Sequence, residues 1–174
     1  MQGAVKLLAG FALLCGWASA AVTDSSANGF TVKVALNVQA SPDDVYRKFV
    51  HNIGDWWDAA HTFSKDSHNL SIEERPGGCF CEKLPGGGVR HMEVVYVSPG
   101  VAVVLSGGLG PLQSLAATGT LTISFQKGTN GGTTLDVTYA VSGYLPQGMN
   151  TWAAPVDGVI TSQFTRLKNF AEKK

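Results

Sequence analysis

The sequence contains few cysteines and no excess of either charge. Only three of its 174 residues are cysteine, which excludes a fold held together by several disulfides. The chain is long enough to bury a hydrophobic core without them. Basic and acidic residues balance at 13 each, and no basic run is present. This balance argues against nucleic acid or an anionic membrane as a partner. The chain also lacks internal repeats.

One long hydrophobic run is present, and it lies in the first 20 residues, which have the three parts of an export signal. Lys6 gives a short basic start, residues 7–17 are apolar, and small residues at 18–20 form a cleavage site. The apolar run is shorter than the roughly 20 residues that span a bilayer. We therefore expect a cleaved signal over residues 1–20, a periplasmic or secreted protein, and no stable membrane anchor after cleavage.

After the signal we expect a flexible polar lead over residues 21–29 and a single domain over 30–172. Apolar and polar residues alternate from Phe30 to Val38, which predicts a half-buried first strand. Between Asn69 and Tyr144, glycine and proline turns separate further alternating segments, which predicts an antiparallel meander. An apolar stripe with a period near 3.6 begins at Trp152 and predicts a long closing helix that packs on the sheet.

A helix start is well signalled between the first strand and the meander. Ser41 can serve as N-cap, Pro42 suits the first helical position, and two aspartates follow in the first turn. Gly54 is expected to end this helix just before the adjacent Trp56 and Trp57. Such dense aromatic bulk beside strands closes a core or walls a pocket.

The two tryptophans cannot face the same way, because adjacent residues on a helix point about 100° apart. We assign Trp57 to the ligand side, since it is nearer His61, whose imidazole can donate a hydrogen bond to a ligand carbonyl or carboxylate. Trp56 is left to seal the helix against the sheet. Enclosure of both rings by the core would contradict this assignment. His61 has an ordinary alternative role, which is to cap a local turn.

Cys79 and Cys81 are the only cysteines after the signal, and their i, i+2 spacing puts both on one face of a strand. Three interpretations stay open: two buried apolar thiols, a disulfide, and a soft-metal or redox site with Met92 as a further ligand. Two strand steps span about 6.6 Å, which is near the upper limit for a disulfide.

The turn that follows the cysteines sets which residues they face. A turn over residues 85–88 would place Glu82 opposite His91 and put Met92 on the cysteine face, which keeps the apolar side chains together. A three-residue loop would shift the pairing by one residue. In the first register Glu82 and His91 form an exposed cross-strand pair rather than a catalytic dyad.

The order of a strand, short helices, a meander of about six strands and a long closing helix resembles the START-like helix-grip superfamily, also called SRPBCC. The resemblance covers nearly all the mature chain and is strongest to the exported branch grouped with polyketide-cyclase-like and Aha-type chaperone-ATPase-activator-like domains. The segments that carry it are Trp56 to Thr62, Asn69 to Ser71, Gly77 to Glu82, His91-Met92, Leu105 to Leu112 and Pro155 to Gly158. It implies an α+β fold in which a curved antiparallel sheet of six or seven strands wraps around the C-terminal helix, with an apolar ligand cavity between them.

We therefore expect the protein to bind a small hydrophobic or amphipathic molecule in that cavity, with no cofactor. The expected ligand contacts are Trp57, Met92, Tyr139, Trp152, Val156 and Val159 as walls, His61 as a polar contact, and Leu109 and Leu112 as a lid in a glycine-rich loop. That loop has a plainer alternative role as a connection packed on the core. A polyketide cyclase or dehydratase that uses His61 or a cysteine as acid or base is the enzymatic alternative. A protein-binding role like that of the chaperone activators is disfavoured by export. No motif specifies the ligand or an oligomeric state.

Overall fold

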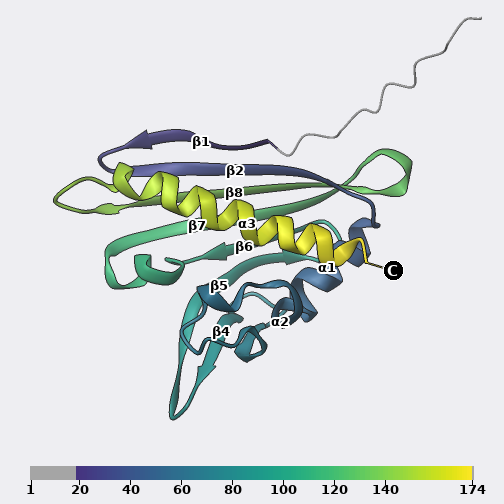
Figure 1. Ribbon diagram of the computed structural model, residues 1–174, viewed down its shortest axis with the longest axis horizontal. Helices are drawn as coiled ribbons and strands as arrows, with labels where there is room; N and C mark the ends of the chain where they lie inside the picture. Colours follow the sequence, from purple (N-terminus) through teal and green to yellow (C-terminus); the bar gives the residue numbers. More distant parts are fainter. Residues whose placement is uncertain (1–18, 174) are drawn as a thin grey trace, which may run out of the picture.

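The computed structural model describes residues 19–173, which form one curved antiparallel sheet of eight strands packed against three α-helices (Figure 1). The strand order across the sheet is β1-β2-β8-β7-β6-β5-β4-β3. The strands are β1 (Ser19–Ser26), β2 (Gly29–Val38), β3 (Leu70–Ile72), β4 (Cys79–Leu84), β5 (Gly87–Ser98), β6 (Ala102–Ser106), β7 (Ala116–Lys127) and β8 (Thr133–Tyr144). The predicted export signal lies outside the described residues, apart from its last two positions in β1.

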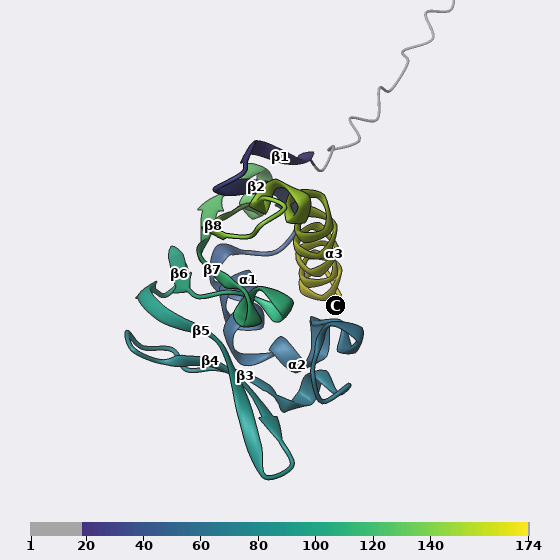
Figure 2. The same cartoon turned by 90° about the vertical axis from the view of Figure 1, so that its left-hand side faces the viewer.

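The helices α1 (Pro42–His51), α2 (Ile53–Trp56) and α3 (Ala153–Ala171) lie on the concave side of the sheet. Figure 2 shows the sheet curving around them, and α3 packs most extensively on β2 while also contacting β1, α1 and α2. The connection that carries α1 and α2 links β2 to β3 at the far edge of the sheet. Short 3-10 helices are η1 (Ala59–His61), η2 (Ser67–Asn69), η3 (Gly110–Ser114), η4 (Thr129–Gly131) and η5 (Met149–Trp152). Within residues 19–173 no helix is both long and apolar enough to cross a bilayer.

Strand β1 is the main difference from the expected architecture. The sequence predicts a flexible lead over residues 21–29, whereas β1 pairs antiparallel with β2, from Ser19 opposite Ala35 to Ser26 opposite Gly29. Nearly all of its described side chains are exposed, so it carries no period-two apolar signal. It is an edge strand held by its backbone ladder, and it raises the strand count to eight.

The alternation predicted for the central strands is confirmed. In β2, β7 and β8 every second side chain points into the core and is buried, while its neighbours face outward. The buried set is Phe30, Val32, Val34, Leu36, Val38, Leu121, Ile123, Phe125, Leu135, Val137, Tyr139 and Val141. These residues form the apolar face of the sheet on which the helices pack, α3 mainly on β2 and α1 on β7.

The start of α1 agrees with its sequence signals, but its end does not. The Ser41 hydroxyl accepts a hydrogen bond from the Asp44 amide at 3.2 Å, as expected of an N-cap. The break falls at Asn52, and Gly54 lies inside α2. A Cβ atom on Gly54 would lie 3.0 Å from the His68 Cα atom. Glycine therefore allows η2 to approach α2 closely rather than ending the helix.

An aromatic cluster joins α1, α2 and α3 beneath the sheet. Phe164 of α3 stacks on Phe49 of α1, and its ring centroid lies 6.2 Å from that of Phe49 and 6.2 Å from that of Trp56. Phe49 also contacts Phe125 of β7 with centroids 5.9 Å apart. One side chain of α3 thus connects both other helices, and through Phe49 the sheet.

Replacing Phe164 with alanine should cost about 3–5 kcal/mol of unfolding free energy, because the fully buried ring leaves a cavity at this junction. Urea unfolding followed by circular dichroism measures the loss. Phe63→Ala is the matched control, since that ring is 53% exposed and its loss should change stability by less than about 0.5 kcal/mol. Equal losses in the two variants would contradict the role of the cluster.

Candidate functional site

Both tryptophans at the end of α2 are enclosed by the core. Their side chains are 1% exposed for Trp56 and 7% for Trp57. The Trp57 ring packs edge-on against Phe80 with centroids 5.6 Å apart, and its Nε1 donates to the His61 carbonyl at 3.2 Å. The assignment of Trp57 to a cavity wall is therefore contradicted. Its indole instead fixes the chain where it leaves α2.

His61 closes the 3-10 helix η1 and its imidazole is exposed at the surface. The capping role in this turn belongs to Asp58, whose carboxylate accepts from the Ala60 amide at 2.9 Å. The contact of His61 with Trp57 is through its backbone.

Tyr139 holds the lid loop, residues 107–112, onto the inner face of β8. Its fully buried hydroxyl donates to the Gly107 carbonyl at 3.1 Å and accepts from the Leu109 amide at 3.0 Å. Burial raises the pKa of Tyr139 to about 12, so the hydroxyl stays protonated. Gly119 makes room for this ring, because a Cβ atom there would lie 2.6 Å from Cε2 of Tyr139. Within this loop Leu112 is buried and Leu109 is half-buried.

Removing the Tyr139 hydroxyl should loosen the lid loop. Tyr139→Phe leaves the Gly107 carbonyl and the Leu109 amide without their partner, which costs about 1–3 kcal/mol. Hydrogen exchange at the Leu109 amide should accelerate while the exchange of β8 amides stays unchanged. Tyr144→Phe, at a side chain that is 73% exposed, should leave the loop as it is. Unchanged protection of Leu109 in Tyr139→Phe would contradict the anchoring role.

A single strip along α3 and its N-cap, Trp152, contains three of the predicted wall residues. Trp152, Val156 and Val159 follow at i, i+4 and i+7, so they lie on one side of the helix, and all three are half-buried. The next position of the same strip is Gln163, which is 0% exposed. The strip therefore runs from the half-exposed N-terminal part of α3 to a polar side chain in the interior.

Only one of the two polar atoms of the Gln163 side chain has a hydrogen-bond partner. Its Oε1 accepts from the Asp58 amide at 2.9 Å, whereas its Nε2 has no hydrogen-bond partner among residues 19–173. A buried donor without a partner costs about 1–3 kcal/mol, so such groups usually meet a water or a ligand. Asp157 and Thr161 also carry a buried unpaired oxygen, but on another side of α3. Gln163 was not among the residues singled out from the sequence, although a polar residue that continues an apolar strip at heptad spacing was a readable signal.

The remaining predicted wall residues are interior. Met92 is 1% exposed and Tyr139 is 0% exposed, so both belong to the packed core. Two surface hollows of about 430 and 500 Å³ lie elsewhere: the first on β1, β2, β7 and β8, and the second beside residues 39–41 and 130–132. Neither is lined by a predicted contact residue. The candidate ligand site is thus the α3 strip and the lid loop rather than either hollow.

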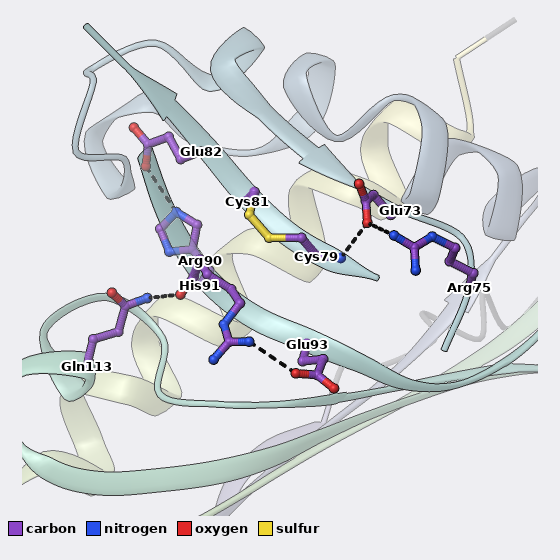
Figure 3. The surroundings of a disulfide bond; sticks show 9 residues. All are labelled: Glu73, Arg75, Cys79, Cys81, Glu82, Arg90, His91, Glu93 and Gln113. Atoms are coloured by element: carbon purple, nitrogen blue, oxygen red, sulfur yellow. Dashed lines mark hydrogen bonds and ion pairs between the residues drawn. A yellow bond between two sulfur atoms is a disulfide. The ribbon is translucent and has the colours of Figure 1, made fainter. Parts of the chain in front are cut away.

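The β4–β5 hairpin has a different register from the one predicted. Its turn contains only Pro85 and Gly86, because the next two glycines extend β5, so Glu82 lies opposite Val89 instead of His91. A bulge between Phe80 and Cys81 then shifts the pairing by one residue. Figure 3 shows the result, with Glu82 and His91 on one side of the hairpin and the sulfur atoms on the other.

Cys79 and Cys81 are joined in a disulfide on the outer, half-exposed face of β4. Their Cα atoms are 5.3 Å apart, less than two regular strand steps, because the bulge lies between them. The soft-metal interpretation is wrong: the sulfurs are bonded to each other and Met92 points into the core. The described residues also contain no cluster of three His, Cys, Asp or Glu side chains that could hold a metal.

Glu82 and His91 form a buried pair rather than the exposed pair predicted. The Glu82 carboxylate lies 3.0 Å from Nε2 of His91, with side-chain exposures of 0% and 5%. Glu82 also accepts from the amides of Phe63 and Ser64. Burial opposes the charge on Glu82, but these hydrogen bonds hold its pKa below the usual range. Burial lowers the pKa of His91. The pair therefore fixes the segment after η1 onto β4.

The Glu82–His91 pair should make the fold sensitive to acid. The pKa of His91 is lowered below 6.5 in the folded state, so its contribution is present above pH 6.5 and is lost as the pH falls. The lowered pKa of Glu82 acts in the same direction below pH 4.5. Unfolding free energy from urea titrations should fall between pH 7 and pH 5, and His91→Gln should reduce that fall. His61→Gln is the control that should keep the wild-type slope; a steeper slope in His91→Gln would contradict the assignment.

No family model matches the chain, and no curated protein matches its sequence. Solved structures do share its architecture. CalU16 from Micromonospora echinospora has a TM-score of 0.56 at 12% identity, with 90% of this chain and 86% of that chain covered. DynU16, a protein of the dynemicin biosynthetic locus, has a TM-score of 0.56 at 18% identity over 82% of this chain and 47% of its own. Ara h 8.0201 has a TM-score of 0.56 at 10% identity, covering 81% of this chain and 96% of that one.

At these identities the likeness concerns the fold alone. The eight-stranded antiparallel sheet and long C-terminal helix are the α+β helix-grip architecture, as predicted, with one or two strands more than expected.

Proposed function

We propose that this chain is an exported helix-grip protein that binds a small amphipathic molecule along the α3 strip of Trp152, Val156 and Val159. The apolar part of the ligand packs on these half-buried side chains, beneath the lid loop. Its polar end, a carbonyl, carboxylate or similar acceptor, receives a hydrogen bond from Nε2 of Gln163. The unpaired, fully buried amide nitrogen of Gln163 is the observation that carries this proposal.

The chemistry of the strip favours an amphipathic ligand over a purely apolar one. An apolar ligand would leave the Gln163 donor unsatisfied, and a strongly polar ligand would gain nothing from Trp152 and the two valines. A ligand with one acceptor and an apolar body satisfies both. In this proposal the lid loop controls access, because the hydrogen bonds of Tyr139 hold Gly107 and Leu109 in place.

One structural neighbour supports a small-molecule role by analogy. DynU16 belongs to a biosynthetic locus for dynemicin, which links this architecture to natural-product chemistry in that protein. The cyclase or dehydratase alternative has less support in this chain. Cys79 and Cys81 are bonded to each other, and the His61 imidazole is exposed. No described feature favours the protein-binding alternative.

Native mass spectrometry of the protein purified from its own host tests this proposal. We expect a small molecule that remains bound under native conditions and is released on denaturation. Recovery from the periplasm or culture medium, with the chain beginning at Ala21, would support export. Protein that stays empty when purified gently from its own host would overturn the binding role.

The contribution of Gln163 can be measured with an amphipathic probe that carries an anionic acceptor, 1-anilinonaphthalene-8-sulfonate. Gln163→Met keeps the length and apolar stem of the side chain but removes the amide donor, and should weaken binding about tenfold. Fluorescence titration gives the two dissociation constants. Gln147→Met, at an exposed glutamine, should bind like the wild type. Equal affinity in all three proteins would place the probe elsewhere.

A further inference from the structure

The Cys79–Cys81 disulfide has features that a purely structural crosslink does not need. It closes a loop with a single intervening residue, Phe80, so it removes little conformational freedom from the unfolded chain. The bond lies on the outer face of β4, where both cysteines are half-exposed. β3 pairs with β4 only from Phe80 to Glu82, so Cys79 lies beyond the end of the β3 ladder. A thiol from solution can therefore reach the bond without unfolding the core.

The surroundings of the two sulfurs are charged and asymmetric. Cys81 lies opposite Arg90 on β5, and Cys79 lies opposite Glu93. Residues directly opposite each other in an antiparallel pair have Cβ atoms about 5 Å apart, so the side chain of Arg90 starts beside Cys81. Figure 3 shows Arg90 turned along the outer face toward Glu93, with which it forms an ion pair at 3.1 Å. A cation beside a cysteine stabilises its thiolate and makes it a better leaving group.

We propose that Cys79–Cys81 is a thiol–disulfide exchange site, activated by Arg90, that accepts two electrons from a dithiol reductant. The exposed face, the minimal loop and the neighbouring cation point to this role together. It uses none of the residues proposed to bind the ligand, so it stands or falls independently of that function.

The exchange balances in two steps. A thiolate of the reductant attacks Cys79 Sγ, the Cys79–Cys81 bond breaks, and Cys81 leaves as a thiolate beside Arg90. The second thiol of the reductant, after losing its proton, attacks the reductant's own sulfur in the mixed disulfide, closes the reductant's disulfide and releases Cys79 as a thiolate. Both protein thiolates take protons from water. The reductant ends as a disulfide, and the protein has gained two electrons and two protons.

Exchange in the native state can be measured by reduction with dithiothreitol, quenching with iodoacetamide and peptide mass mapping. We expect both cysteines to be alkylated without denaturant and without loss of the far-ultraviolet circular dichroism. The reduced protein should melt less than about 6 °C below the oxidised one. Labelling that appears only after denaturation would overturn the proposal.

Two arginines provide a matched test of activation. Arg90 and Arg75 are similarly exposed and each pairs with a glutamate, but only Arg90 lies opposite a cysteine. Arg90→Gln should slow native-state reduction about threefold, which follows from a change of about one unit in the pKa of the leaving thiol. Arg75→Gln should reduce at the wild-type rate. Equal rates in the two variants would overturn the role of Arg90.

Discussion

The packing of α3 on the concave face of the sheet is the constraint on which the rest of the structure depends. β2, β7 and β8 each present one apolar face to the concave side, where α3 packs mainly on β2 with Ile160, Phe164 and Leu167 fully buried and α1 packs on β7. Phe164 ties the helix to α1 and α2, so the helices are fixed relative to one another as well as to the sheet. Gln163 is next to Phe164 in this interface. Its amide nitrogen is therefore an unpaired donor inside the packed part of the protein.

The same packing explains why the proposed ligand contacts differ from those expected. The rings of Trp56 and Trp57 are packed in the core, and the hydroxyl of Tyr139 is bonded to the lid loop. What remains accessible is the flank of α3 above Gln163, where Trp152 and Val156 are half-buried. Binding is therefore proposed on the helix flank, with the buried rings as support.

The sequence predicted most of the fold because its signals were local. Period-two alternation located the central strands, and the cap at Ser41 located α1. Elements without a burial pattern were missed, as β1 was, since an edge strand depends on backbone pairing alone. Gly54 was misassigned because its role is a contact with η2, far along the chain. The hairpin register failed because Gly87 and Gly88 extend β5 and a bulge follows, so Glu82 became buried and the cysteines turned outward.

The central claim is that a ligand on α3 reaches the amide of Gln163, and nuclear magnetic resonance of isotope-labelled protein tests it most directly. During titration with 1-anilinonaphthalene-8-sulfonate, the side-chain amide resonances of Gln163 and the indole resonance of Trp152 should shift together and saturate. Resonances of exposed outer-face residues such as Tyr96 should stay in place. Saturable shifts confined to the outer face, with Gln163 unmoved, would contradict the account.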